Sequence, residues 1–351
     1  MATAQPLASE KAWNIEPIDF PHDGTSREVL AFLVRYAMLA PSGHNTQPWC
    51  FVLADSHVDI VADESRALER VDPHGRELTI SCACAAETMY AALRAFGLTG
   101  SLIPLPVPQA PDVIARVTLS DVPSKGIEDY ETLEAIASRR TVRLPYADTP
   151  IPHDVQTLLI ETARPFGVEL TLQDNAAVKD GVAALVADAD RIQFADPAFR
   201  AEFASWMHPL TSPSGDGLAG PGFGFPDWAT RAAASLFRMF DLGSAVARMD
   251  KPNVLGAPLL GVFSTTGDTR AEWVATGRAL AAVLHQLTMR RIVNAFLNQP
   301  IEVTTIRPKL AELTVPGRTP QLLCRFGYLK EGVALPPHSA RRPFNDVIIA
   351  A

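Results

Sequence analysis

An internal repeat constrains this chain more than any other feature of its sequence. The tripeptide Pro-His-Asp occurs at residues 21–23 and again at 152–154, and each copy opens a helical segment. A strand-like run follows each helix and finishes at an aspartate, Asp55 in the first copy and Asp174 in the second. With 351 residues and 47% apolar content, the chain is long enough to bury a large core. The repeat therefore predicts a duplicated fold.

The two copies differ by seven residues. From Ala37 to Asp55 there are 18 positions, whereas from Ala163 to Asp174 there are 11. The extra residues of the first copy lie within the stretch 40–49, APSGHNTQPW, between an amphipathic helix and a buried strand. Small and amide side chains at such a junction can present N–H groups to a flat polar ligand. An ordinary proline-terminated helix and turn would share this composition.

A cluster of arginines stands at residues 139–143, with the sequence RRTVR, at the end of a helical run over 130–138. Each guanidinium group offers a planar fork of donors and keeps its charge, which suits a phosphate group. Clustered arginines also occur on solvated helix faces. The cluster alone therefore leaves both interpretations open.

Together the two motifs resemble those of the nitroreductase family of FMN-binding proteins. Residues 40–49 resemble the flavin loop of that family, and 139–143 resemble its Arg-Arg-Ser-x-Arg phosphate signature. Residues 145–152 resemble the segment that leads to the next helix of the family. Family members carry the arginines before the loop and share each flavin across a dimer interface, but here the loop comes first. The resemblance is greatest to the Acg-type branch, and it implies a single-chain pseudo-dimer with two fused nitroreductase-like halves.

The resemblance implies one complete composite FMN site, because the loop is absent from the second copy and residues 11–16 of the first contain no arginine pair. The cofactor-binding residues that it implies are Pro41, Ser42, Gly43, His44, Asn45, Gln47, Arg139, Arg140, Thr141, Arg143, Gln299, Pro300, Arg341 and Arg342. No catalytic side chain is assigned, because the flavin carries the chemistry. His44 is either a proton donor or a loop histidine that bonds to its neighbours.

Two pairs in this set rest on weaker matches. Gln299 and Pro300 follow a long helix, at a point where the glycine usual in the family is absent. Arg341 and Arg342 match the basic C-terminal pair of the family, which completes the phosphate site, but an exposed basic tail would have the same sequence.

The expected fold is α+β, with antiparallel or mixed sheets around a central helical layer. We expect a first half at 20–122 and a second half at 128–351. Thr25 and Glu28 form a capping-box pattern at the start of a helix. Apolar spacing predicts further helices at 78–96, 179–193 and 270–297, and strands at 113–119, 258–264 and 321–328.

Residues 206–228 are too rich in glycine and proline to continue a helix or a central strand. Trp206, Phe223, Phe225 and Trp228 argue against disorder, because aromatic side chains favour burial. We interpret the segment as a lid over the flavin, with a purely structural loop as the alternative.

Charge and composition limit the partners. A net charge of −8 argues against nucleic-acid binding, which requires a basic surface. No apolar run has membrane-spanning length, and the N-terminus has no signal-peptide pattern, so we expect a cytoplasmic protein without a membrane partner. Cys50, Cys82, Cys84 and Cys324 are expected to pack in the core, because too few further ligands accompany them for a metal site.

Two functions of different classes follow from the resemblance. The first is an FMN-dependent oxidoreductase that passes electrons from NAD(P)H to a small acceptor such as a nitroaromatic, a quinone or another conjugated compound. The second is an FMN-sequestering or storage protein whose lid blocks turnover. A specialised flavin dehydrogenase is a third possibility. No nucleotide-binding glycine fingerprint follows a strand, so NAD(P)H would bind only transiently. The fused halves are expected to make the protein monomeric.

The reversed motif order predicts one tightly bound FMN per chain. Flavin absorbance and phosphate analysis of purified protein measure this ratio. Two equivalents of bound FMN per chain would contradict the single composite site.

Overall fold

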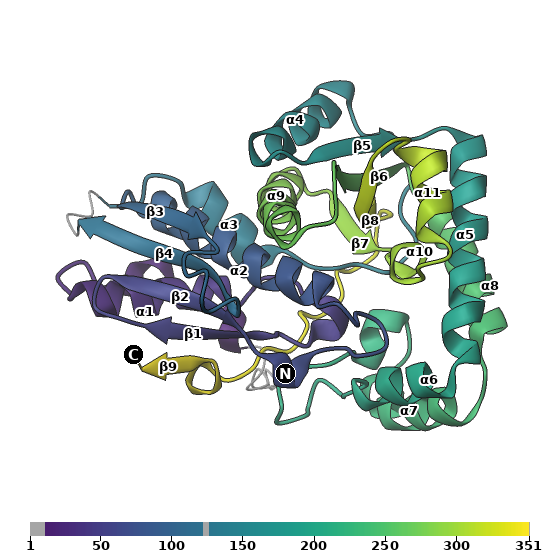
Figure 1. Cartoon of the computed structure of the whole chain (residues 1–351), viewed down its shortest axis with the longest axis horizontal. Helices are drawn as coiled ribbons and strands as arrows, with labels where there is room; N and C mark the ends of the chain where they lie inside the picture. The colour runs from purple at the N-terminus through teal and green to yellow at the C-terminus, as the bar shows by residue number, and fades with distance from the viewer. Residues whose placement is uncertain (1–10, 122–125, 351) are drawn as a thin grey trace.

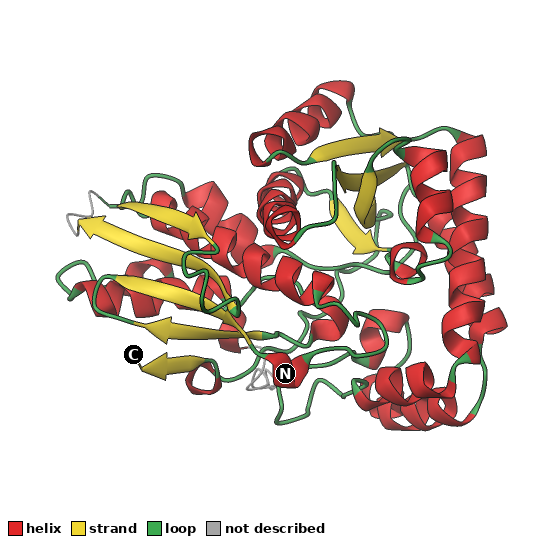
Figure 2. Cartoon of the chain, in the orientation of Figure 1, coloured by secondary structure: helices red, strands yellow, loops and turns green. Residues whose placement is uncertain are grey.

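The structure, a computed structural model, describes residues 11–121 and 126–350. It contains two sheets with helices between and around them (Figures 1 and 2), which confirms the predicted α+β class. The strands are β1 (Trp49–Leu53), β2 (His57–Ala62), β3 (Thr99–Pro104), β4 (Val113–Asp121), β5 (Glu169–Gln173), β6 (Leu259–Thr265), β7 (Val293–Phe296), β8 (Thr319–Gly327) and β9 (Ile348–Ala350). The α-helices are α1 (Ser26–Ala37), α2 (Arg76–Ala95), α3 (Tyr130–Ser138), α4 (His153–Ala163), α5 (Ala176–Ala195), α6 (Pro197–Ser205), α7 (Thr230–Met239), α8 (Gly243–Leu255), α9 (Arg270–Met289), α10 (Gln299–Glu302) and α11 (Arg307–Thr314).

Both sheets repeat one topology. The first has the order β3-β4-β2-β1, and the second read in the same sense is β7-β8-β6-β5. All of these neighbouring strands are antiparallel. α1 precedes β1 as α4 precedes β5, and α2 follows β2 as α9 follows β6. The shared strand order agrees with the duplication that the repeated tripeptide indicates. The boundaries of the two halves, 20–122 and 128–351, stay a prediction.

The C-terminal arm joins the two parts of the fold. After β8 the chain leaves the second sheet and runs to the first, where β9 lies parallel to β1 with Phe51 opposite Ile348. Figure 1 shows this yellow segment passing beneath the central helices. The last strand of the chain therefore extends the first sheet and carries the arm past the end of α1.

The corresponding helices α2 and α9 cross at the centre of the molecule (Figure 1). Small residues of α2 lie at the crossing: Ala83 and Cys84 are fully buried, and both contact position 277 of α9. A Cβ atom built at Gly277 of α9 would collide with the backbone oxygen of Ile80 in α2. The two backbones therefore approach so closely that position 277 admits only glycine in this geometry.

The N-terminal end of α1 follows the predicted pattern. The Thr25 side chain accepts a hydrogen bond from the Glu28 amide, and the Glu28 carboxylate accepts one from the Thr25 amide at 2.7 Å. Val29, Leu30 and Leu33 are fully buried against the core. A reciprocal cap and an apolar stripe thus fix α1, and with it the loop that follows.

The helix predicted at 270–297 is shorter than expected. α9 ends at Met289, and residues 293–296 form β7, which pairs with β8. The break occurs at Arg291, which takes a left-handed backbone conformation with φ of 57°. The β-branched residues Ile292 and Val293 then favour a strand, whose hydrogen-bonding partner lies far along the chain.

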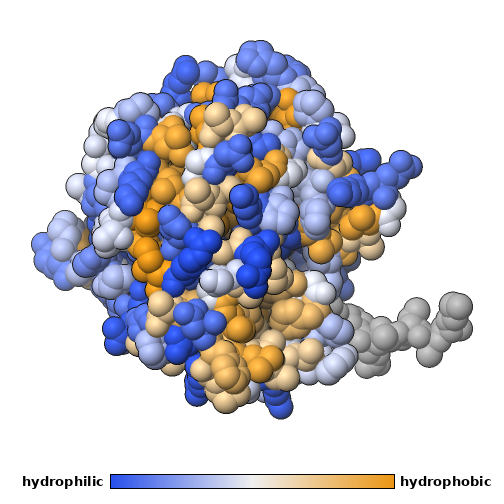
Figure 3. Space-filling view, turned by 90° about the vertical axis from the view of Figure 1, so that its right-hand side faces the viewer, coloured by the Kyte–Doolittle hydropathy of each residue, from blue (hydrophilic) through white to orange (hydrophobic). Residues whose placement is uncertain are grey.

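The segment between β5 and β6 is much longer than its counterpart in the first half and contains α5 to α8. It projects at the right and lower right of Figure 1. Figure 3 shows this side, with apolar side chains gathered at its lower part, at the level of α6 and α7. Leu236, Met239 and Phe240 are exposed there, beside Trp228.

None of the helices in the described residues combines the length and the apolar content that crossing a membrane requires. All four cysteines are free, and burial raises the pKa of the Cys84 thiol to about 12. Within 11–121 and 126–350, no cluster of three His, Cys, Asp or Glu side chains is placed to hold a metal ion.

Replacing Gly277 with alanine is expected to lower the free energy of unfolding by about 1–3 kcal/mol, because overpacking forces the two helices apart. Elsewhere in a helix the same change stabilises by about 1 kcal/mol, so the collision with Ile80 decides the sign. Thermal unfolding measures the effect, with Ala271→Ser at an exposed position of α9 as the control. A higher Tm for Gly277→Ala would contradict the close crossing.

Candidate functional site

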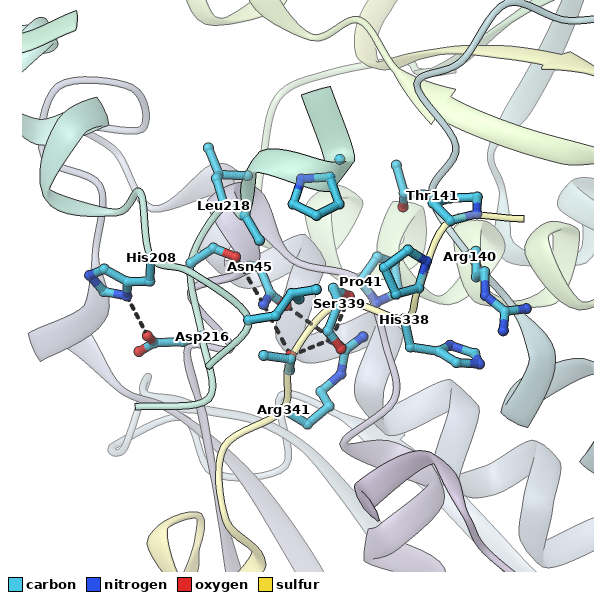
Figure 4. A pocket seen from close by; sticks show the side chains of 18 of the residues that line it. Pro41, Asn45, Arg140, Thr141, His208, Asp216, Leu218, His338, Ser339 and Arg341 are labelled. Atoms are coloured by element: carbon cyan, nitrogen blue, oxygen red, sulfur yellow. Dashed lines mark hydrogen bonds and ion pairs between the residues drawn. The ribbon is translucent and has the colours of Figure 1, made fainter. Parts of the chain in front are cut away.

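Three segments that are distant in sequence meet at the C-terminal end of α1. They are the loop at 40–49, the arginine cluster at 139–143 after α3, and the C-terminal arm at 336–341. Figure 4 shows Pro41 and Asn45 of the loop beside Ser339 and Arg341 of the arm, with Arg140 and Thr141 across the same hollow. The two predicted motifs therefore lie in one site.

The loop has an unusual backbone. His44, Asn45 and Gln47 all have positive φ angles, of 46°, 54° and 50°. Such angles are uncommon outside glycine, and each costs on the order of 1–3 kcal/mol. The Ser42 hydroxyl accepts a hydrogen bond from the Gln47 amide at 2.9 Å, which closes the turn. Strain of this kind, held by the surrounding structure, is typical of functional sites.

Two buried guanidinium groups bind the carbonyl groups of residues 38–40, directly after α1. Arg139 donates to the oxygen of Leu39 at 2.7 Å. Arg341 donates to the oxygens of Met38 at 2.7 Å, Leu39 at 2.9 Å and Ala40 at 3.0 Å. These carbonyl groups would otherwise lack partners at the negative end of the helix dipole. One side chain from each of two remote segments thus fixes the start of the loop.

The positive charge at this point is not neutralised by a carboxylate. Burial lowers the pKa of Arg139 to about 10. Burial also lowers the pKa of Arg341 well below its ordinary value, and repulsion from Arg139 lowers it further. Neither side chain forms an ion pair with the residues that the structure describes. An anion bound beside them would therefore be strongly favoured.

The other two arginines of the cluster lie on the opposite wall. The buried Nε of Arg140 has no hydrogen-bond partner in the described residues. The guanidinium group of Arg143 lies 4.9 Å from the ring centre of Phe223, which belongs to the segment 206–228. Burial lowers the pKa of Arg143, and the nearby charge of Asp250 opposes this shift. The N–H groups of Arg140 and Arg143 thus do not bind the carbonyl groups that follow α1.

These walls enclose a pocket whose cavity volume is about 100 Å³. Small-molecule sites usually measure about 300–1,000 Å³. Residues 208–210, 216–219 and 221–222 form much of the wall, so this segment in its present position leaves little room. The predicted residues that line the pocket are Pro41, Ser42, Asn45, Arg139, Arg140, Thr141, Arg143 and Arg341.

Comparison with known proteins agrees with this arrangement. No family model matches the sequence. The chain is 28% identical over 333 residues to the putative NAD(P)H nitroreductase Acg of Mycobacterium tuberculosis, a match that covers 93% of this chain and 97% of that protein. This chain is therefore similar, over nearly its whole length, to proteins named as putative NAD(P)H nitroreductases. The putative NAD(P)H nitroreductase Rv3131 of the same organism is 28% identical over 348 residues, or 94% of this chain and 92% of that protein.

Solved structures of nitroreductases match a smaller part of the chain. A nitroreductase with bound FMN from Desulfitobacterium hafniense is 13% identical, with a TM-score of 0.36, and covers 63% of this chain and 98% of its own. The FMN- and NADPH-dependent nitroreductase NfnB is 18% identical, with a TM-score of 0.40, and covers 62% of this chain and 97% of its own.

The remaining predicted residues do not line the pocket: Gly43, His44, Gln47, Gln299, Pro300 and Arg342. Gln47 is fully buried, and its side chain donates to the oxygen of Gly215 at 2.8 Å and accepts from the Arg342 amide at 2.9 Å. The Arg342 guanidinium group donates to the oxygens of Gln47 at 3.0 Å and Trp49 at 3.2 Å. These two residues therefore hold the arm and the segment 206–228 against the loop, and an exposed basic tail is excluded.

The other members of this group lie in the packing around the pocket. The Nδ1 atom of His44 is buried without a hydrogen-bond partner in the described residues, and burial lowers its pKa to about 4. This shift favours the neutral imidazole, which agrees better with a loop histidine than with an imidazolium proton donor. Gln299 donates to Asp250 at 3.1 Å, and Pro300 is buried in α10. A role for these residues toward a cofactor stays a prediction.

The segment 206–228 is latched onto the loop. Asn45 donates from its side chain to the oxygen of Gly217 at 3.2 Å and accepts from the Gly217 amide at 3.3 Å. Asp216, which is 5% exposed, forms an ion pair with Arg66 and a hydrogen bond of 2.8 Å with Nδ1 of His208. Figure 4 shows this histidine–aspartate pair at the edge of the pocket.

Sequence reasoning missed this latch. Asp216 is the one acidic residue in the stretch 207–226, which makes it conspicuous. It stands between Gly215 and Gly217, which both have positive φ angles. A Cβ atom at Gly215 would collide with the backbone oxygen of Arg341. A lone acid between two glycines is the signal that could have identified the point of closest approach.

The latch is expected to weaken as the pH rises. The hydrogen bond to Asp216 raises the pKa of His208. The imidazolium therefore stabilises the latch fully below pH 6.5, and this stabilisation is lost as the pH rises through the raised pKa. Burial alone would raise the pKa of Asp216, but hydrogen bonds from His208, Ser214 and Arg66 outweigh it and lower the value. The carboxylate contribution is therefore complete above pH 3.8 and lost below it.

Hydrogen-exchange protection factors of residues 208–218 measure this dependence. Asp216→Asn should reduce local protection by about 1.5–3 kcal/mol, the loss of a charge-assisted bond, and should abolish the pH dependence. Asp188→Asn on the exposed face of α5 is the control. Equal protection in Asp216→Asn and the parent protein would show that the latch does not hold the segment.

Proposed function

We propose that this protein is an FMN-dependent oxidoreductase that passes electrons from NAD(P)H to a nitroaromatic, quinone or other conjugated acceptor. The observation that carries the proposal is the cluster of buried guanidinium groups without a carboxylate partner, beside a strained loop rich in N–H donors. The likeness to proteins named as putative NAD(P)H nitroreductases supports it. A cytoplasmic, monomeric protein is part of the same proposal.

The residues at the pocket fit the phosphate group of FMN. The unpartnered Nε of Arg140 and the guanidinium group of Arg143 face a common hollow with the Thr141 side chain. Arg139 and Arg341 add positive charge at the same pocket, although their N–H groups already donate to the carbonyl groups that follow α1. A dianionic phosphate would relieve the mutual repulsion of these cations and satisfy the free donor.

The other walls suit the remainder of the cofactor. FMN supplies hydride transfer when it is bound. Ser42 and Asn45 offer polar groups from the loop, while Leu210, Leu218 and Pro221 form an apolar cover. The cover excludes water from the pocket, and the loop donors stabilise negative charge that develops at a polar edge. Burial lowers the pKa of His44, so we assign proton delivery to solvent rather than to this side chain.

A second function, storage of FMN without turnover, is favoured by one observation. Residues of the segment 208–222 line the pocket and are latched onto the loop, so an acceptor could reach a bound flavin only after this segment moves. An oxidoreductase requires the latched segment to open so that an acceptor reaches the flavin, whereas a storage protein keeps the segment closed.

Arg143→Ala is expected to weaken FMN binding by about 1.5–3 kcal/mol, because it removes a charge-assisted hydrogen bond. Arg139→Ala should also weaken it, with a lower Tm because the Leu39 carbonyl group loses one of its two guanidinium donors. Fluorescence titration of apoprotein with FMN measures the affinity, and Arg27→Ala on the exposed face of α1 is the control. Normal affinity in both variants would place the arginines outside the site.

Replacing residues 207–226 with a short Gly/Ser linker distinguishes between electron transfer and storage. If the segment is an inhibitory lid, electron transfer from NADPH to a quinone should rise while the phosphate contacts stay intact. Stopped-flow measurement of flavin reduction and reoxidation follows both steps. Turnover of the unaltered protein at about 1–1,000 per second would exclude storage. Unchanged FMN affinity and acceptor range in the variant would mean that the segment is not a lid.

A further inference from the structure

A second cleft lies beside the pocket. Its volume is about 540 Å³, within the range of roughly 300–1,000 Å³ that small-molecule sites occupy. Leu210 and Arg341 line both hollows, so the cleft adjoins the pocket across the latched segment and the arm. The cleft therefore lies within reach of a ligand that extends out of the pocket.

The walls of this cleft carry positive charge. Lys11 and Arg35 line it, and its described lining residues include no Asp or Glu. Arg35 makes one long hydrogen bond, 3.4 Å, to the oxygen of Asn14, and it forms no ion pair with the described residues. Lys11 also forms no ion pair within that part of the chain. Both cations are therefore available to an anionic ligand.

The rest of the cleft suits a base attached to a phosphate. Met38, Leu210 and Phe344 provide an apolar floor, and the hydroxyl groups of Thr211 and Ser212 stand beside it. An apolar floor with an aromatic edge binds a heterocyclic ring, whereas the hydroxyl groups and the two cations bind phosphate oxygens. This combination matches an adenosine that bears a phosphate ester.

We propose that this cleft binds the adenosine end of NADPH, with Lys11 and Arg35 holding its 2′-phosphate. The inference rests on the proposed function, since it supplies the site from which the electron donor reaches the pocket. An arginine is the usual partner of the 2′-phosphate, which NADH lacks. The chain therefore uses NADPH in preference to NADH, and Lys11 and Arg35 determine this specificity.

Binding of adenosine phosphates by calorimetry tests the cleft without requiring turnover. The full chain is expected to bind 2′,5′-ADP at least tenfold more tightly than 5′-AMP. Arg35→Ala and Lys11→Ala should each weaken 2′,5′-ADP binding at least fivefold and leave 5′-AMP binding nearly unchanged. Arg27→Ala, on the same helix but outside the cleft, should bind like the parent protein.

Several results would overturn the assignment. They are equal affinity for the two nucleotides, displacement of 2′,5′-ADP by inorganic phosphate at similar concentration, and unchanged binding in both variants. Flavin reduction by NADPH and NADH gives the second readout, because the ratio of kcat/KM for the two donors should fall at least tenfold in Arg35→Ala. If neither donor reduces the flavin, the proposed function fails, and the calorimetric comparison still decides what the cleft binds.

Discussion

The hydrogen bonds from two buried guanidinium groups to the carbonyl groups of residues 38–40, directly after α1, are the contacts on which the site depends. Arg139 comes from the start of the second half, and Arg341 comes from the C-terminal arm. Both reach the backbone of residues 38–40, immediately before the loop. The helix end holds these cations without neutralising them, because carbonyl groups carry only partial charge. The same contacts therefore fix the loop and leave a positive field for an anion.

The two copies of the repeat differ where the loop stands. Both sheets have the same strand order, yet the second copy is seven residues shorter at the point where the first copy has the loop. Its connection from β5 to β6 instead carries α5 to α8 and the segment that covers the pocket. Each half thus contributes something that the other lacks: the first provides the loop, and the second provides arginines and cover. One chain supplies both sides of the site.

Local sequence signals predicted the elements well. The capping box of α1 is present, and α3 has the bounds 130–138 that its spacing indicated. The prediction of one helix over 270–297 was wrong at its C-terminal end. That end depends on the pairing of β7 with β8 and on the left-handed backbone of Arg291, and apolar spacing indicates neither. Most of the loop and arginine residues line the pocket, because a motif places its members together.

The exceptions at the site come from contacts between remote segments. Gln47 and Arg342 bind each other and the covering segment, although the motif alone indicated a cofactor contact. The latch of Asp216 with Arg66 joins positions 150 apart, so the local pattern that marks Asp216 does not identify its partner. Such pairs are determined by how the two halves pack, which the sequence of either half does not contain.

A crystal structure of the FMN-loaded protein tests the central claim most directly. We expect one flavin per chain, with its phosphate within hydrogen-bonding distance of Arg140 and Arg143 and its ring against residues 41–45. A flavin bound at the corresponding position of the other half, between the loop after α4 and the first sheet, would contradict it.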